Sequence, residues 1–454
     1  MATIIKQKPI LIKGSNHPVT VESITCMAVE SCTRLVPVNM IWIYSNKSNL
    51  SKENFIPSNY LQVTLSHILN DFPMLSGRIT EDSKGDAVVH LTNEGVLYTE
   101  AECIDQTLDY FIPQSISSNQ EFDYENINNS DLLMSVSSDW TGLCLSIQIT
   151  YLKCNSVILS ISGFHCLVDA NSVAFFMNAW ASAKLANPEP FFDKSFILYP
   201  TDEEQQETIR PKNCVFNRNS NHQFDESKCI VNQQQRVIRR IYHFSVDELK
   251  NIKNEASKNL SNSIDYISTY DALFAHLVLV IAEATQTSLK DHVKILQAVN
   301  GRPQFVSSYS PSVLNYFGSL AFWLYDKLPI DNKQTLSSLA EFIHEMHSKQ
   351  TEQSLRDYNT YLMSGHRNEI RDKPDADIIN HDFHCTSWRK FHLLSPKFFN
   401  SDYPIYSGPA DYVYQRFFLM MDANSFNESI NIIFGLKEQD YERMIQQNNL
   451  HKYR

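Results

Sequence analysis

Residues 163–170 read GFHCLVDA and place His165 four residues before Asp169, between a strand-like run and a helix-like run. The same HxxxD spacing also occurs at His67 and at His243. A loop between a strand and a helix is where a scaffold often presents a reactive side chain. The spacing alone does not separate a catalytic histidine from a structural one, so the surrounding pattern has to decide.

The other two HxxxD matches have structural explanations. Residues 58–71 have the apolar spacing of an amphipathic helix, on which His67 and Asp71 would be surface neighbours. The pair at His243 spans a strand end and a helix start, where Asp247 is a favourable first-turn carboxylate. For His165 a structural role and a catalytic role remain equally open on these grounds.

Composition bounds the class of protein. The 454 residues exceed what one hydrophobic core usually supports, which favours two domains. A net charge of -12 argues against a nucleic-acid partner, because binding phosphates needs clustered Lys and Arg. Nine cysteines lack CxxC or zinc-type spacing, so free thiols and no metal site are expected. No membrane span or signal peptide is predicted, and the expected location is the cytoplasm.

Strands and helices alternate in both halves of the chain, and a polar stretch separates the halves. The first half contains a predicted hairpin over residues 143–151 and 157–164, and a helix over 170–185 follows it. The second half contains a predicted buried helix over residues 268–284. The predicted organisation is an α/β domain at 1–190, an unpacked connector at 191–235 and a second α/β domain at 236–454.

Several blocks of the chain resemble, in order, those of the BAHD acyltransferases, an acyl-CoA-dependent family of plants and fungi. No single block is specific, but their joint order extends over almost the whole chain. Ala170 stands where the family usually has a glycine. The blocks are FPMLSGRI (72–79), TNEGVLYTEA (92–101), GFHCLVDA (163–170), STYDALFAHL (268–277), VNGRP (299–303), YFGSL (316–320), TSW (386–388) and PIYSGP (404–409).

One block departs from the family pattern. Where the family carries DFGWG, this chain reads KFFNSDYP at residues 397–404, and only Phe398 and Pro404 fit. The block is mainly structural in the family, so its loss does not by itself remove chemistry. The chain therefore resembles a divergent member, nearer to fungal or protist relatives.

The resemblance implies two chloramphenicol-acetyltransferase-like domains, each a mixed β-sheet flanked by helices, with a tunnel at their interface. Acyl-CoA would be the co-substrate that donates the acyl group, and a small-molecule alcohol or amine would accept it. No cofactor would be bound permanently. The protein would be a monomer. His165 would be the general base, and no covalent enzyme intermediate would form. Asp169 would point away from the imidazole and pair with Arg302, in a structural role.

The resemblance also indicates an oxyanion or acceptor pocket at Thr386, Ser387 and Trp388, since a tetrahedral oxyanion needs a preorganised hydrogen-bond donor. A core position for Trp388 and a strand position for Thr386 explain these residues equally well. The pocket assignment therefore needs the structure.

Candidates for binding coenzyme A lie further along the chain. Ser268 and Thr269 begin the buried helix and could contact the pantetheine arm or its phosphates, although plain N-capping also explains Ser268. Lys253 and Lys258, with Lys250, form a basic patch that could meet the phosphates. A solvated helix face explains these lysines as well.

Two rival functions remain. A condensation-type domain of peptide synthesis shares the fold and the motif, but it carries a second histidine where this chain has Phe164. A non-catalytic BAHD-like partner in lipid or metabolite assembly belongs to a different class. The altered block at residues 397–404 favours that second rival, and the intact His165 weighs against it.

Overall fold

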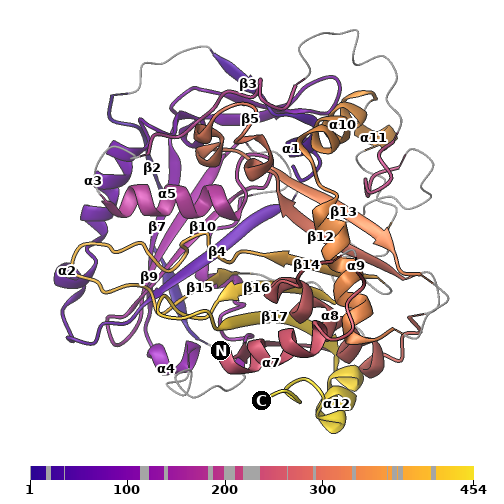
Figure 1. The fold of residues 1–454 in the computed structure, drawn as a ribbon. Helices are drawn as coiled ribbons and strands as arrows, with labels where there is room; N and C mark the ends of the chain where they lie inside the picture. Colours follow the sequence, from indigo (N-terminus) through magenta and orange to yellow (C-terminus); the bar gives the residue numbers. More distant parts are fainter. Residues whose placement is uncertain are drawn as a thin grey trace.

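Two large mixed β-sheets and one small sheet form the framework of the protein (Figure 1). The computed structural model describes residues 2–16, 22–34, 36–112, 122–136, 142–182, 188–198, 210–217, 236–262, 264–289, 293–329, 334–365, 367–370, 376, 382–410 and 416–454. Within these residues, no helix combines the length and the apolar character that crossing a membrane requires.

The first large sheet has the order β1-β7-β9-β10-β4-β15, and β2 also pairs with β7. The predicted hairpin is confirmed, because β9 and β10 pair antiparallel. All residues of β9 and β10 are buried, since both faces of this sheet are covered. The strands are β1 (Ile4–Lys6), β2 (Ile10–Ile12), β4 (Pro37–Tyr44), β7 (Val96–Cys103), β9 (Leu145–Tyr151), β10 (Val157–Phe164) and β15 (Tyr406–Pro409).

The second large sheet has the order β13-β12-β14-β16-β17-β11-β8. Its central strands β12, β14 and β16 run parallel, so their carboxyl ends meet at one edge. Its strands are β8 (Phe122–Asp123), β11 (Val237–Phe244), β12 (Lys294–Asn300), β13 (Ala321–Lys327), β14 (Phe383–Ser387), β16 (Phe417–Asp422) and β17 (Ile430–Lys437). The small sheet contains β3 (Ser23–Thr25), β5 (Arg78–Glu81) and β6 (Ala87–His90).

Each large sheet takes one strand from the other half of the sequence. The late strand β15 pairs with β4 in the first sheet, and the early strand β8 pairs with β11 in the second. Two stretches of the expected connector are also packed, because Phe196 and Cys214 are fully buried in one core cluster. The connector is therefore not unpacked at residues 191–198 and 210–217, and the halves share both strands and core.

Helices cover the outer faces of the two sheets (Figure 1). Helices α3 and α5 pack with the first sheet, and α7, α8, α9 and α12 pack with the second. The helices are α1 (Ala28–Ser31), α2 (Lys52–Phe55), α3 (Ser58–Ile68), α4 (Leu108–Phe111), α5 (Ala170–Ser182), α7 (Val246–Ala256), α8 (Thr269–Ala284), α9 (Leu336–Ser348), α10 (Glu352–Met363), α11 (Arg367–Ile370) and α12 (Glu438–Gln447), with 3₁₀ turns at η1 (Pro73–Ser76), η3 (Ser130–Leu132), η5 (Arg302–Phe305) and η6 (Pro311–Asn315).

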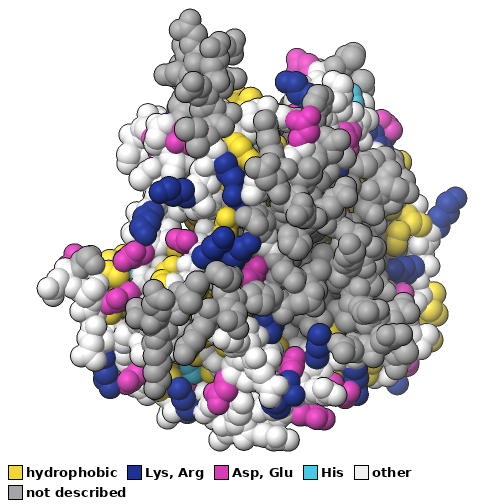
Figure 2. All heavy atoms as spheres, turned by 90° about the vertical axis from the view of Figure 1, so that its right-hand side faces the viewer, with side chains coloured by type: hydrophobic (Ala, Val, Ile, Leu, Met, Phe, Trp, Pro, Cys, Tyr) yellow, Lys and Arg dark blue, Asp and Glu magenta, His cyan; other side chains and the backbone are white. Residues whose placement is uncertain are grey.

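The structure confirms one of the two predictions made for the other HxxxD matches, at His67 and His243, and contradicts the other. Helix α3 ends at Ile68, so the prediction that His67 and Asp71 share one helix is wrong. The other prediction is confirmed, because His243 lies in β11 and Asp247 lies in the first turn of α7. On the face in Figure 2, described basic and acidic side chains are interspersed, and no continuous basic field is visible among them.

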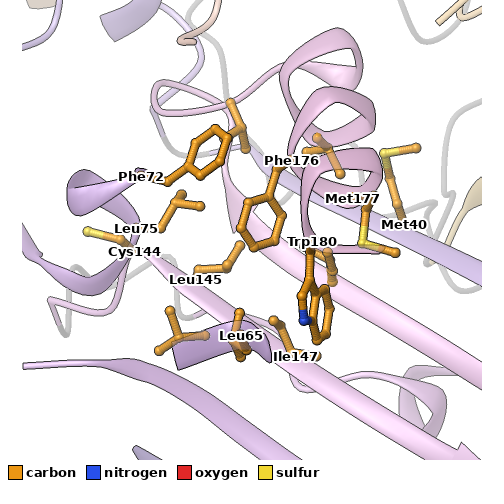
Figure 3. Packing of buried hydrophobic residues seen from close by; sticks show 14 of the residues in the cluster. Met40, Leu65, Phe72, Leu75, Cys144, Leu145, Ile147, Phe176, Met177 and Trp180 are labelled. Carbon is orange, nitrogen blue, oxygen red and sulfur yellow. The ribbon is translucent and has the colours of Figure 1, made fainter. Parts of the chain in front are cut away.

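Phe72 links three segments of the first core (Figure 3). Its ring centroid lies 5.3 Å from that of Phe176 on α5 and 4.7 Å from that of Phe317 in the YFGSL block. The side chain is fully buried. The early block that contains Phe72 therefore packs directly against both segments that border His165.

Replacing Phe72 with alanine should lower the free energy of unfolding by about 3–5 kcal/mol, because the change leaves a cavity among buried rings. Chemical denaturation monitored by circular dichroism measures this loss. The matched control is Phe426→Ala, since Phe426 is 88% exposed and its loss should change stability by about 0.5 kcal/mol or less. Equal losses of stability in the two variants would contradict the role of Phe72 in the first core.

Candidate active site

His165 lies in the turn between β10 and α5. The pairing of β10 with β4 ends just before it, where Phe164 lies opposite Pro37. The backbone N–H of His165 then donates to the Val36 carbonyl at 2.9 Å, which extends the strand contact by one residue. The backbone of His165 is therefore fixed by a sheet edge, although its side chain lies in a turn.

The imidazole of His165 is held through one nitrogen. Its Nδ1 lies 3.0 Å from the hydroxyl oxygen of Ser319, a buried residue of the YFGSL block. Its Nε2 makes no hydrogen bond to a described residue. Burial lowers the pKa of His165 below the ordinary histidine value, and the Asp169 carboxylate acts in the opposite direction. The ring is therefore neutral near neutral pH, with Nε2 available to accept a proton.

Asp169 does not hydrogen-bond to His165. Its two carboxylate oxygens accept from the Arg302 guanidinium at 2.7 and 3.1 Å, and both side chains are buried. Its oxygens also accept from the backbone N–H groups of Ser172 and Leu320, at 2.8 and 3.0 Å. Although burial alone would raise the pKa of Asp169, the guanidinium and these donors outweigh it and hold the pKa below its ordinary value.

The remaining N–H groups of Arg302 donate to residues that lie around the same ion pair. Its Nε donates to the Tyr316 carbonyl, and its terminal nitrogens donate to Asn300 Oδ1, the Ser172 hydroxyl and the Gly318 carbonyl, at 2.9 to 3.1 Å. A buried guanidinium whose N–H groups all have hydrogen-bond acceptors holds the segments around it in a fixed arrangement. Because its partners come from both halves of the chain, Arg302 fixes the His165 turn against the second sheet.

A second buried carboxylate, Glu30 of α1, reinforces the same contact. It accepts from the Tyr316 hydroxyl at 2.7 Å, from the Ser319 backbone N–H at 3.2 Å and from Lys194 Nζ at 2.8 Å. Burial alone would lower the pKa of Lys194, but the Glu30 carboxylate outweighs it and holds the pKa above its ordinary value. A Cβ at Gly318 would lie 2.5 Å from Glu30 Oε1, so a larger residue here would displace the buried Glu30 carboxylate.

The structure separates the three residues expected at the oxyanion or acceptor pocket. Thr386 lies opposite Ala298 of β12 and Leu419 of β16, on the inner face of the second sheet. Ser387 alternates to the helix-covered face of the strand. Trp388 follows the strand and packs between two core clusters. Of the three, Thr386 and Trp388 lie towards the first sheet, and the pocket assignment remains a prediction.

The candidates for binding coenzyme A lie together at one end of α7 and α8. Ser268 caps α8, because its hydroxyl accepts from the Asp271 N–H and the Asp271 carboxylate accepts from the Ser268 N–H. Thr269 is partly exposed at the first helical position. Lys253 lies in the last turn of α7, and Lys258, just beyond it, pairs with Glu255 at 2.5 Å. The capping role is confirmed, and a role in coenzyme A binding remains a prediction.

Sequence reasoning missed four side chains of this site. Glu30, Ser172, Lys194 and Ser319 each contact the residues that hold the histidine turn. Ser319 follows the glycine of the YFGSL block, which could have marked it. The other three lie in segments without a local pattern that indicates such a contact. Among the described residues, no group of His, Cys, Asp and Glu is arranged to hold a metal ion.

Asp169→Ala should cost about 3–5 kcal/mol in the free energy of unfolding, because it leaves the Arg302 guanidinium buried and unpaired. Urea denaturation measures the loss. The double variant Asp169→Ala with Arg302→Met is the control, and it should regain part of the stability because no buried charge is left without a partner. An Asp169→Ala protein as stable as the wild type would contradict the structural role.

Comparison with known proteins agrees with this architecture. The sequence model of the Transferase family matches residues 14–451. Shikimate O-hydroxycinnamoyltransferase from Nicotiana tabacum is 25% identical over 402 residues, covering 84% of this chain and 85% of that protein. Among solved structures, vinorine synthase superposes with a TM-score of 0.70 at 18% identity, covering 97% of this chain and 96% of the other.

A second solved structure, F. graminearum TRI101 complexed with coenzyme A and deoxynivalenol, has a TM-score of 0.74 at 15% identity. The match covers 95% of this chain and 99% of that one. At these identities, the structural likeness establishes the fold, and it confirms the prediction of two sheet-containing halves. The family match extends over nearly the whole chain, so the protein belongs to the Transferase family, the BAHD-type acyl-CoA-dependent acyltransferases.

Proposed function

We propose that the protein transfers an acyl group from acyl-CoA to a hydroxyl or amine of a small molecule, with His165 as the general base. The observation that carries this proposal is the state of the imidazole. Its Nδ1 is anchored by Ser319, its Nε2 is not hydrogen-bonded to a described residue, and burial keeps the ring neutral. These are the properties that a proton acceptor needs near neutral pH.

The reaction then proceeds in two proton transfers and one acyl transfer. His165 Nε2 takes the proton from the acceptor hydroxyl or amine as that oxygen or nitrogen attacks the thioester carbonyl. The carbonyl oxygen becomes an oxyanion in a tetrahedral intermediate. The intermediate collapses by breaking the carbon–sulfur bond, and the proton passes from the imidazolium to the departing thiolate. No covalent bond to the protein forms.

Ser319 is a positioning residue in this scheme. When its hydroxyl accepts from the Nδ1–H of His165, the tautomer is fixed with the lone pair on Nε2. Thr386 and Trp388 are the candidate donors for the oxyanion, and Thr386 lies beside Ala298 on the face of the second sheet that the helices do not cover. A tunnel between the two sheets would bring the two substrates to His165 from opposite sides.

Solved relatives support coenzyme A as the acyl carrier. F. graminearum TRI101 was crystallised with coenzyme A and deoxynivalenol, and F. sporotrichioides TRI101 with coenzyme A and T-2. For this chain, Ser268, Thr269, Lys253 and Lys258 remain the candidate contacts for the pantetheine arm and phosphates. We further propose that the protein acts as a cytoplasmic monomer and binds acyl-CoA only as a substrate.

The alternative of a non-catalytic partner rested on the altered block at residues 397–404. Within that block Phe398 is fully buried, and its ring lies 4.9 Å from Trp180 and 6.1 Å from Tyr44. The block therefore keeps a packing role, although its glycines are absent. The altered block therefore gives no sign that the first core is disrupted, which is compatible with an enzyme.

His165→Ala should lower the rate of acyl transfer by at least about 100-fold, because the general base is lost, while the protein stays folded. The measurement is release of free thiol from acetyl-CoA and longer acyl-CoAs, with a panel of alcohols and amines. His67→Ala is the matched control, since His67 is exposed on α3 and belongs to another HxxxD match to which no catalytic role is assigned. Its rate should equal the wild-type rate.

Absence of thiol release from the wild type with every donor and acceptor pair would favour the non-catalytic partner. Equal rates for the wild type and His165→Ala would remove His165 from the chemistry and overturn the proposed mechanism. A folded His165→Ala protein is required for either conclusion, and its thermal midpoint provides that check.

The pH dependence should follow the lowered pKa of His165. Only the neutral imidazole accepts a proton, so kcat/KM should rise as pH increases through the pKa and then level off. Because burial lowers that pKa, the midpoint of the rise should lie below the ordinary histidine value of about 6.5. Steady-state kinetics in buffers of constant ionic strength measure the profile. A midpoint above the ordinary histidine pKa would contradict the assignment of the buried His165 as the general base.

A further inference from the structure

Two buried carboxylates bind neighbouring N–H groups of the segment that contains Ser319. The Ser319 N–H donates to Glu30 Oε1 at 3.2 Å, and the Leu320 N–H donates to Asp169 Oδ2 at 3.0 Å. All four residues are buried. An unpaired polar group at this depth is costly, so Ser319 cannot shift without the loss of a hydrogen bond that stabilises the fold.

The side chain of Ser319 affects the state of the His165 ring. Its Oγ lies 3.0 Å from His165 Nδ1, and Nε2 of the same ring makes no hydrogen bond to a described residue. The hydrogen bond that one ring nitrogen makes selects the tautomer of a neutral imidazole. A hydroxyl placed to accept from Nδ1–H therefore favours the tautomer with its lone pair on Nε2, and any residue that fixes Ser319 also affects the base.

Glu30 is itself held in place by four donors. Its Oε2 accepts from Lys194 Nζ at 2.8 Å and from the Met27 N–H at 2.7 Å. Its Oε1 accepts from the Tyr316 hydroxyl at 2.7 Å in addition to the Ser319 N–H. Burial, and next the Glu30 carboxylate, raise the pKa of Tyr316, so its hydroxyl keeps its proton and remains a donor. The carboxylate therefore has a fixed position beneath Ser319.

The packing around Gly318 shows how little room this carboxylate has. A Cβ at Gly318 would lie 2.5 Å from Glu30 Oε1 and 2.7 Å from the Tyr316 hydroxyl oxygen. Both distances are too short for an ordinary contact, so a single methyl group there would move the carboxylate or its hydroxyl partner. The backbone before Ser319 and the Glu30 carboxylate are therefore in direct contact.

We propose that Glu30 is a positioning residue for the general base. Glu30 fixes Ser319, and through Ser319 it keeps His165 in the tautomer whose lone pair lies on Nε2. The proposal rests on the acyl-transfer function for its effect on rate, whereas its effect on the tautomer is independent of any reaction. Because Lys194 belongs to the expected connector, its ion pair with Glu30 also gives residues 188–198 a part in the site.

Two double variants of the full chain separate the hydrogen bond to Ser319 from the charge of Glu30. Glu30→Leu with Lys194→Met removes both charges and also the acceptor for the Ser319 N–H. Glu30→Gln with Lys194→Met removes both charges as well, but its amide oxygen can accept from the Ser319 N–H. Neither variant leaves an unpaired buried charge, which would be strongly destabilising by itself.

Glu30→Leu with Lys194→Met should lower kcat roughly tenfold and change KM less than about threefold, because a misplaced base slows the chemistry without removing substrate contacts. Glu30→Gln with Lys194→Met should keep kcat within about threefold of the wild-type value. Thiol release from acyl-CoA measures both constants. A merely structural role would lower the thermal midpoints of the two variants without a difference in kcat between them.

Nuclear magnetic resonance of protein labelled with nitrogen-15 histidine reports the tautomer without turnover, and His165→Ala identifies the signals of His165. The Nδ1–H form should dominate in the wild type and in Glu30→Gln with Lys194→Met. The Nε2–H form should appear in Glu30→Leu with Lys194→Met, because the Ser319 hydroxyl is no longer held at Nδ1.

Gly318→Ala provides a second route that keeps both charges. The added methyl group should displace the Glu30 carboxylate, so the tautomer and kcat should change in the same direction as in Glu30→Leu with Lys194→Met. This single variant decides the proposal if a double variant does not fold.

An unchanged His165 tautomer in folded Glu30→Leu with Lys194→Met, or in Gly318→Ala, would overturn the positioning role. Equal kcat values in the two double variants would overturn it as well. Absence of thiol release from the wild type would instead reject the acyl transfer, and the tautomer measurement would still decide the role of Glu30.

Discussion

The buried ion pair between Asp169 and Arg302 is the contact on which the site depends. A buried charge is tolerated only when it is paired and hydrogen-bonded, and here every direction of the guanidinium is satisfied. The Asp169 carboxylate also accepts from the N–H of Ser172, in the first turn of α5, and from the N–H of Leu320. Leu320 follows Ser319, so the ion pair fixes both the turn that carries His165 and the hydroxyl that orients its ring.

The same ion pair explains why His165 and Asp169 have different roles, although both belong to one short motif. An unpaired carboxylate near His165 would raise the pKa of the imidazole and keep it protonated. Arg302 neutralises that carboxylate, and burial then lowers the pKa of the imidazole. Asp169 therefore acts on the histidine through the fold, and its ion pair allows a neutral base to lie one helical turn from an acid.

Local sequence patterns predict what local geometry determines. The hairpin before His165 and the capped helix α8 follow from periodicity and from capping residues. The link from Asp169 to Arg302 follows from the family blocks, and the structure contains it. The Ser319 hydroxyl reaches His165 across 154 residues, and the Glu30 carboxylate reaches Ser319 across 289. Such contacts join segments that lie far apart in the sequence, and no local pattern encodes them.

The altered block at residues 397–404 shows how a family feature can be replaced physically. Phe399 adopts a φ of 51°, a left-handed conformation that costs a residue with a side chain about 1–2 kcal/mol. Its ring packs on Tyr60 at 5.0 Å, and the preceding Phe398 is buried against Trp180. Aromatic packing thus offsets the strain that glycine avoids in this turn. These contacts belong to the first core, so the divergence of this block acts on the stability of that core.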